Sequence, residues 1–334
     1  MRAVNREVVL RRPCAGRPVA EDFEVVDRPE PEAATGFVTV RSLYQALDPY
    51  IGTRLRGRHM GEPAPAPGEN LPGYAVGEVL ASGDPDLAPG DLVVGEMGWV
   101  ERGRMAATAV RKVDPTLSAA DHLGLLGLPG LTAWAGVTQL AKITAGDVFS
   151  VDAAAGAVGG TAGQIARHLG ARTVGIAGGA EKCALVRDLY GFDAAIDYRL
   201  EGWVEAYGAA VGKGPTAHFE NVGVSVLAPV LQRLQSYGRI VLCGLAEHYH
   251  ADGPPAQLPI GPLVGKRAQV FGLVVYDFFP RLTEWVAMAR PWIEAGTLTL
   301  AHDIGEGAES APGHFERLLK GENQGRALVQ MSPS

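Results

Sequence analysis

The segment from Val148 to Ala177 constrains the fold of this chain most, because it reads as a strand, a turn of small residues, a helix and a second strand. Four further short apolar runs follow, and amphipathic stretches separate them; they span 194–198, 217–222, 238–244 and 269–275. Strands that alternate with helices at this spacing are typical of parallel βαβ units with helices on both faces of the sheet. The sequence therefore predicts an α/β fold with a doubly wound parallel sheet of the Rossmann type.

The turn after the first of these strands suits the pyrophosphate of a dinucleotide. Ala154 to Gly159 have the pattern A-x-G-x-x-G, in which Gly156 lets the backbone approach the phosphates and Gly159 lets the helix pack closely on the strand. The pattern is weak alone in a chain rich in Ala and Gly, but its place between a strand and a helix strengthens it. We expect Ala155, Gly156, Val158 and Gly159 to bind the cofactor.

The end of the next strand favours NADPH over NADH. NAD sites usually place Asp or Glu there, to accept a hydrogen bond from the ribose 2′-hydroxyl. This chain has Gly178 and Gly179, followed by Lys182, whose ammonium can pair with a 2′-phosphate. Glu181 is the nearest carboxylate and lies beyond the strand. The alternative is that Lys182 is an ordinary exposed helix lysine.

The first 120 residues have a different pattern, with short β-prone runs separated by Gly and Pro, which predicts a β-rich barrel or sandwich. The Pro- and Gly-dense segment 54–72 is expected to be irregular, either a lid over a cleft or a solvated loop. Pro129 and Gly130 are expected to break the helical stretch around them. The short β-rich tail is expected to return to the first domain.

These patterns give two domains, consistent with a length of 334 residues. Residues 1–122, completed by 300–334, form the first, and residues 123–299 form the nucleotide-binding domain. No apolar run is long enough to span a membrane, and the N-terminus carries no secretory signal pattern, so the cytoplasm is the expected location.

Charge and cysteine content exclude other classes of function. The formal net charge is −7 with no basic stretch, which argues against a nucleic-acid partner. Cys14, Cys183 and Cys243 are far apart and form no CxxC pair, so neither a disulfide framework nor a four-cysteine zinc lobe is expected. Each is expected to be a small buried apolar residue.

Several stretches then identify a family. LDPYIGTRL, LGLPGLTAWAGV, AAAGAVGG, IAGGAEKC, GFDAAIDYR, FENVG, GRIVLCG and GENQGRALV occur in this order over nearly the whole chain. On them the chain resembles the zinc-independent medium-chain dehydrogenase/reductases, and within these the NADPH-dependent alkenal double-bond reductases, also called leukotriene B4 dehydrogenase or prostaglandin reductase, with curcumin reductase beside them. The resemblance implies a GroES-like first domain and a nucleotide-binding second domain.

The resemblance also implies roles for individual residues. Lys182 and Tyr198 would hold the 2′-phosphate, Asn221 the nicotinamide-side ribose, and Asn323 would reach the cofactor from the tail. Backbone contacts are implied for Cys243, Gly244 and the stretch Phe271 to Val274, with Phe271 and Leu273 as its main contributors. The chain departs from the family pattern at Val224, at Tyr249-His250 and in the Pro-rich segment, all around the expected substrate cleft. The substrate class therefore carries over less securely than the cofactor.

No metal site is expected. Ala46 stands where the zinc-dependent branch of the family would place a cysteine, and Gly68-Glu69-Asn70 lacks the histidine expected there. His59 and His122 are far apart in sequence and have no thiolate partner. Oxidation of an alcohol with Lewis-acid assistance is therefore disfavoured.

Hydride transfer to a C=C bond conjugated with a carbonyl needs no metal. Hydride adds to the β-carbon, charge moves to the carbonyl oxygen, and a proton reaches the α-carbon. Tyr249 is the first candidate for proton donor or oxyanion partner, with His250 able to assist or to face water. Tyr50 is the second candidate; the alternative is that it only packs within the first domain. Tyr249 can also line the pocket without a chemical role, because solvent can protonate an enolate.

Other functions remain open on the sequence. Quinone reduction uses the same cofactor pose, and a reductive cyclase would add hydride to a conjugated polyene and then close a ring. A non-catalytic NADPH-binding sensor is the alternative outside enzymes. The apolar run near 270–275 is expected to be an edge strand that pairs with its copy in a homodimer, unless the chain covers that edge itself.

Overall fold

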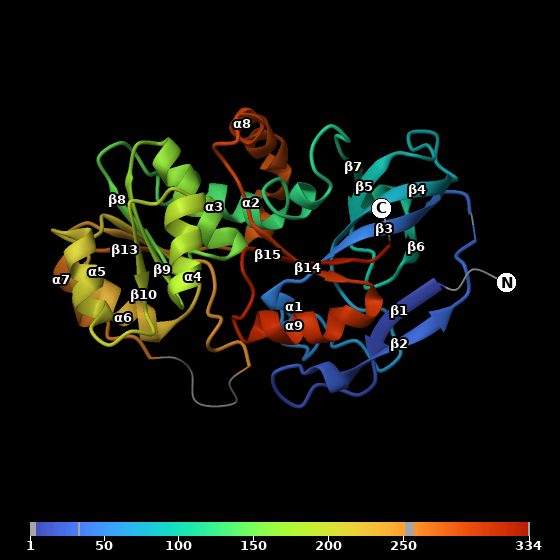
Figure 1. Ribbon diagram of the computed structural model, residues 1–334, viewed down its shortest axis with the longest axis horizontal. Helices are drawn as coiled ribbons and strands as arrows, with labels where there is room; N and C mark the ends of the chain where they lie inside the picture. The colour runs from blue at the N-terminus through green and yellow to red at the C-terminus, as the bar shows by residue number, and fades with distance from the viewer. Residues whose placement is uncertain (1–4, 33, 251–256, 333–334) are drawn as a thin grey trace. The chain divides into compact units, whose positions relative to one another are not determined.

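The computed structural model describes residues 5–32, 34–250 and 257–332 (Figure 1). These residues form two compact units. The first unit holds 5–123, 249–250 and 302–332, and the second holds 124–248 and 257–301. The domain bounds given above stay a prediction. None of the helices in the described ranges is long and apolar enough to cross a membrane.

The second unit contains a six-stranded parallel sheet with the order β10-β9-β8-β11-β12-β13. This order reverses between β8 and β11, and it confirms the predicted doubly wound Rossmann-type sheet. The strands are β8 Val148–Val151, β9 Arg172–Ala177, β10 Ala194–Asp197, β11 Ala217–Glu220, β12 Arg239–Leu242 and β13 Gln269–Gly272.

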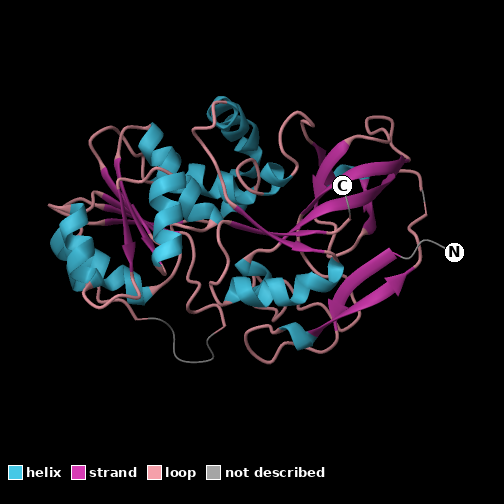
Figure 2. Cartoon of the chain, in the orientation of Figure 1, coloured by secondary structure: helices cyan, strands magenta, loops and turns pink. Residues whose placement is uncertain are grey.

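Helices cover both faces of this sheet (Figure 2). In Figure 1, α3 and α4 lie on one side of the strands, and α5, α6 and α7 lie on the other. The helical segments are α2 Leu128–Trp134, η4 Ala135–Leu140, α3 Ala157–His168, α4 Ala180–Ala184, η5 Leu185–Leu189, α5 Trp203–Val211, α6 Val224–Arg233, α7 Gly261–Lys266, η6 Val275–Arg281 and α8 Leu282–Glu294.

The first unit is rich in β-structure, as expected. A seven-stranded sheet has the order β14-β15-β3-β4-β5-β7, with β6 paired to β3, and a separate hairpin joins β1 and β2. The tail strand β15 pairs antiparallel with β3, so the tail does return to this unit. The strands are β1 Asn5–Leu10, β2 Phe23–Arg28, β3 Phe37–Ala46, β4 Ala75–Ser82, β5 Leu92–Gly95, β6 Arg102–Ala106, β7 Val110–Lys112, β14 His302–Glu306 and β15 Arg326–Gln330.

Short helices complete the first unit, and one core cluster joins them to the hairpin. Ile51 and Phe315 are fully buried in this cluster together with Trp99. The helices are α1 Pro49–Arg54 and α9 Ala311–Leu319, with single-turn segments η1 Ala20–Asp22, η2 Ala107–Ala109, η3 Ala120–Leu123 and η7 Ala308–Ser310. The core therefore fixes α1, the element that carries Tyr50.

Local sequence explains the close packing of the second unit. A Cβ at Gly163 of α3 would lie 1.8 Å from Cζ of Phe192, so only glycine lets this helix pack there. The helical stretch is interrupted at 124–127, directly before α2, and Pro129 itself stands in the first turn of α2, where a missing N–H costs nothing. The helical path then continues without interruption into η4.

Candidate active site

The turn between β8 and α3 lies where the strand order reverses. In sheets of this kind, ligands bind beyond the carboxyl ends of the strands at this point. Ala153 adopts a φ of +44°, and the N–H of Gly156, the N-cap of α3, donates to the Ala153 carbonyl oxygen at 2.8 Å. The turn thus places the N-terminus of the twelve-residue α3, whose first N–H groups have no partners within the helix, at the carboxyl edge of the sheet.

The two glycines of this turn differ in their surroundings. A Cβ at Gly159 would lie 2.6 Å from the Ala153 oxygen and 2.8 Å from the Asp152 oxygen, so no side chain fits. A Cβ at Gly156 would meet only the Ala153 oxygen, at 3.1 Å, so the outer side of Gly156 is open. This geometry suits the predicted roles, with Gly159 against the strand and Gly156 free for a phosphate. Beside them, Ala155 is buried and Val158 is half-buried.

An aromatic ring and a guanidinium pack against the end of β9. A Cβ at Gly178 would lie 2.8 Å from Cε1 of Tyr198 and 3.0 Å from Nε of Arg199. Gly179 has a φ of +98° and donates its N–H to Oδ1 of Asp197 at 2.8 Å. The same Asp197 oxygen accepts the N–H of Arg199 at 3.0 Å, which holds the turn after β10 beside the turn after β9.

Arg199 is a candidate that the sequence analysis missed. Its signal was present, because it directly follows Tyr198 in the quoted stretch GFDAAIDYR, but only the tyrosine was assigned. Tyr198 and Arg199 are exposed at this edge, and Lys182 is half-buried in α4, the helix that follows β9. The structure therefore places two cations, rather than one, on elements next to the end of β9.

Asn221, which follows β11, is held by the carboxyl group of Asp152 at the end of β8. The Asn221 N–H donates to Oδ1 of Asp152 at 2.6 Å, and its Nδ2 donates to the same oxygen and to the Asp152 carbonyl, each at 3.2 Å. Glu220 accepts the N–H groups of Val222 and Gly223 on Oε1, at 2.7 and 2.6 Å. Two buried carboxyl groups thus shape the loop that carries Asn221.

The remaining cofactor candidates of the second unit lie on the next two strands. The N–H groups of Cys243 and Gly244 donate to the Glu220 carbonyl oxygen at 2.9 and 3.1 Å. Burial, with Asp152 and Glu220 nearby, raises the pKa of the Cys243 thiol to about 12, so this thiol is uncharged at neutral pH. Phe271 lies in β13, and Leu273 follows it with its N–H bonded to β12 at 2.9 Å. All these residues line one carboxyl edge.

Both candidate proton donors belong to the first unit. Tyr50 is half-buried in α1, with its ring centroid 5.2 Å from that of His59. Tyr249 precedes His250, whose Cε1 would lie 2.5 Å from a Cβ at Gly52. Glycine at this position of α1 therefore lets the segment that carries Tyr249 pack over the helix that carries Tyr50.

His250 is not a cation at neutral pH. Burial lowers its pKa to about 4, and three arginines add to the effect: Arg17, Arg56 and Arg58. It can therefore assist Tyr249 only as a neutral imidazole. Asn323, the candidate from the tail, is half-buried between α9 and β15, and its Nδ2 donates to the Gly325 carbonyl oxygen at 2.9 Å.

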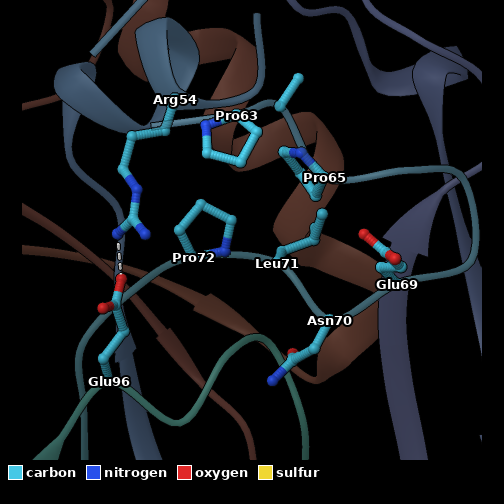
Figure 3. A pocket seen from close by; sticks show the side chains of 9 residues that line it. Arg54, Pro63, Pro65, Glu69, Asn70, Leu71, Pro72 and Glu96 are labelled. Carbon is cyan, nitrogen blue, oxygen red and sulfur yellow. Dashed lines mark hydrogen bonds and ion pairs between the residues drawn. The ribbon is translucent and has the colours of Figure 1, made fainter. Parts of the chain in front are cut away.

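A cavity of about 350 Å³ lies beside α1 in the first unit (Figure 3). Arg54 stands on one side of it and forms ion pairs with Glu62, at 2.7 Å, and with Glu96. Figure 3 shows proline rings and Leu71 around the centre. The lining residues are Arg54, Pro63, Ala64, Pro65, Glu69, Asn70, Leu71, Pro72 and Glu96. The Pro-rich segment is irregular, as predicted.

Comparison with known proteins identifies the family. Residues 6–113 match the family described as "N-terminal domain of oxidoreductase", and residues 157–290 match "Zinc-binding dehydrogenase". The chain is 35% identical to a 2-alkenal reductase (NADP(+)-dependent) of Nicotiana tabacum, with 98% of each chain covered. It is 34% identical to an NADPH-dependent curcumin reductase of Escherichia coli, with 98% of this chain and 97% of that one covered.

The chain belongs to the alkenal, prostaglandin and curcumin reductase group of the medium-chain dehydrogenase/reductases. This group comprises NADP(H)-dependent oxidoreductases of the C=C reductase family. Among solved structures, CurA from Vibrio vulnificus in complex with NADPH matches with a TM-score of 0.92 and 32% identity, over 98% of this chain and all of that one. The predicted resemblance and the Rossmann and GroES-like fold assignment are confirmed.

This chain does not present zinc ligands at the positions that the zinc-dependent branch of the family would use. Ala46 is fully buried in β3, and Glu69 accepts the Ala66 N–H at 2.8 Å. In the part of the chain that the structure describes, one group of three side chains comes close enough to share an ion: Asp152, His218 and Glu220. Both carboxyl groups already accept backbone N–H groups, and we assign no metal to them. The expectation of no metal site stays a prediction.

Proposed function

We propose that this protein is an NADPH-dependent reductase that adds hydride to the β-carbon of a C=C bond conjugated with a carbonyl. The observation that carries the proposal is the end of β9, where Gly178 borders Tyr198 and Arg199 instead of presenting a carboxylate. Cations at this strand end favour a 2′-phosphate, and the end of β9 lacks the carboxylate that usually accepts a hydrogen bond from the ribose 2′-hydroxyl of NADH. The names of the relatives, which include NADP(+)-dependent and NADPH-dependent reductases, support the same cofactor.

The candidate residues have separate roles in this reaction. The cofactor is NADPH, which supplies the hydride when bound. In the second unit, the open turn at Gly156 and the N-terminus of α3 bind the pyrophosphate, and Asn221 orients the nicotinamide-side ribose. In the first unit, Tyr249 or Tyr50 donates a hydrogen bond to the carbonyl oxygen as negative charge develops there, or delivers the proton to the α-carbon.

The test measures turnover and product together. The purified protein is mixed with NADPH, or separately NADH, and a panel of enals, enones and quinones, and oxidation of the reduced nicotinamide is followed by absorbance. We expect NADPH oxidation with enals or enones and a product about two mass units heavier, with the carbonyl retained. Turnover of quinones alone, or NADPH binding with no turnover of any acceptor, would overturn the proposal.

A pair of variants tests the proton donor. Tyr249→Phe should lower kcat with an enone by about 100-fold, the lower end of what general acid catalysis contributes. Tyr237→Phe is the matched control, because Tyr237 is an exposed tyrosine of the second unit, 67% accessible, and should keep full activity. An unchanged kcat in Tyr249→Phe assigns the proton to Tyr50 or to solvent. The homodimer through β13 stays a prediction.

A further inference from the structure

Five buried polar side chains form one connected network beneath the loop that carries Asn221. Ser150, Asp152, Tyr207, His218 and Glu220 are all fully inaccessible to solvent. They come from β8, from α5 and from β11, at the point where the strand order of the sheet reverses. Burial of so many ionisable groups is costly unless each has its partner, so the positions of the hydrogen atoms can be worked out from the geometry.

Tyr207 donates its hydroxyl to Oγ of Ser150 at 3.0 Å. Oγ of Ser150 lies 2.8 Å from Nδ1 of His218, and we assign the serine as the donor because the opposite ring nitrogen, Nε2, then carries its proton toward the Glu220 carboxyl. Burial lowers the pKa of His218, so the ring is neutral and carries its one proton on Nε2. That nitrogen lies 3.3 Å from Oε2 of Glu220 and donates to it.

Glu220 therefore receives hydrogen bonds on both oxygens. Oε2 accepts from His218, and Oε1 accepts from the N–H groups of Val222 and Gly223 at 2.7 and 2.6 Å. These three donated hydrogen bonds favour the ionised form of Glu220 and oppose burial, which raises the pKa of this carboxyl. Gly223 is also the N-cap of the ten-residue α6, and the N-terminus of a helix favours a negative charge.

Asp152 receives fewer short hydrogen bonds than Glu220 does. Its Oδ1 accepts from Asn221 at 2.6 and 3.2 Å, and its Oδ2 accepts the Val222 N–H at 3.4 Å. One of its oxygens lies within 4.8 Å of ligand atoms of His218 and Glu220. A second buried carboxylate beside the first would be repelled, and a proton on Oδ2 removes that repulsion. Burial and the neighbouring charge of Glu220 accordingly raise the pKa of Asp152 well above its usual range.

We propose that Asp152 is a positioning residue that stays protonated at neutral pH, donates to the ionised Glu220, and holds the amide of Asn221 in one orientation. With Nδ2 of Asn221 bound to both the side chain and the carbonyl of Asp152, its Oδ1 is the atom left for the cofactor. An oxygen accepts a hydrogen bond, so it suits a ribose hydroxyl. This role for Asn221 rests on the proposed function, whereas the location of the proton does not.

Two isosteric variants distinguish the protonation states of the two carboxyl groups. Asp152→Asn keeps an acceptor toward Asn221 and places an NH₂ group where the Asp152 hydroxyl donates, so it mimics the protonated acid. Glu220→Gln places an NH₂ group against the donors of His218 and of Asp152. We expect Asp152→Asn to bind NADPH within about threefold of wild type, and Glu220→Gln and Asp152→Ala to bind at least about tenfold more weakly, since each leaves buried groups unpaired.

Infrared difference spectroscopy of the folded protein supplies the second readout. Wild type at neutral pH should show a protonated-carboxyl band that Asp152→Asn lacks. Weak NADPH binding by Asp152→Asn with normal binding by Glu220→Gln would overturn the proposal, because the proton would then belong to Glu220. Persistence of the band in Asp152→Asn would overturn it too, even if Glu220→Gln does not fold. Failure of wild type to bind NADPH would overturn the proposed function and leave the infrared result to decide the proton.

Discussion

Arg199→Gln should weaken NADPH binding while leaving NADH binding unchanged. The Nε atom of Arg199 lies 3.0 Å from the place of a Cβ at Gly178, and its Nη1 lies 3.5 Å from that of Gly179. The guanidinium therefore lies beside the two glycines where a 2′-phosphate is expected. A hydrogen bond to a charged group contributes about 1.5–3 kcal/mol, and exposure of Arg199 at the surface favours the lower end. A loss of about 1.4 kcal/mol corresponds to a Kd for NADPH that rises about tenfold.

The assay is calorimetric or fluorescence titration of both cofactors at low and high salt. Wild type should lose part of its preference for NADPH as salt screens the guanidinium, and Arg199→Gln should show a smaller salt effect. Arg187→Gln is the matched control, because Arg187 is an exposed arginine of η5 that pairs with Asp188 at 2.9 Å. An equal loss for NADH, or no loss for NADPH, would refute the assignment of Arg199 to the 2′-phosphate.

Two further outcomes follow from packing and from proton linkage. Gly163→Ala should lower the free energy of unfolding by about 1–3 kcal/mol, because its Cβ would overlap Phe192. Gly156→Ala should unfold nearly as wild type but bind NADPH more weakly. Denaturant titration and cofactor titration of both variants check these two outcomes. Asp152 keeps its proton in the folded protein, whereas an unfolded Asp loses it near about pH 3.9, so folding takes up a proton above about pH 4. The stability that protonated Asp152 contributes is therefore complete below about pH 3.9 and is lost, by up to about 1.4 kcal/mol per pH unit, as pH rises toward the folded pKa. The free energy of unfolding, measured against pH, should rise for Asp152→Asn relative to wild type over this range. A difference between the two proteins that does not change with pH would mean that Asp152 is ionised.

Much of the fold could be predicted because its signals are local. The second strand of the dinucleotide segment was predicted to end at Ala177, as β9 does, and Gly156 was predicted to be the open position of the turn, since a strand, a turn and a helix each leave a short-range pattern. Pro129 shows the limit of such signals. The same residue breaks a helix interior and begins a helix, and only the path of the chain decides which.

The roles of the candidate site residues stay predictions. The structure places Lys182 in α4, the helix that follows β9, and Asn221 in the loop that follows β11. Arg199 was missed because its relation to Gly178 joins the ends of two strands, and nothing in its own neighbourhood marks a guanidinium as close to another turn. Proximity between segments that are distant in sequence leaves no local pattern.

Local sequence was sufficient to establish the alternation of strands and helices, the glycines of the dinucleotide turn and the preference for NADPH. These depend on periodicity, on backbone freedom and on the side chain at one strand end, all of which are properties of a few neighbouring residues. Tertiary structure was needed to show that Asp152 and Glu220 are buried together and that His250 packs over Gly52 as a neutral ring. Protonation depends on burial and on charges brought close by folding, because both change the cost of an ion far more than sequence neighbours do.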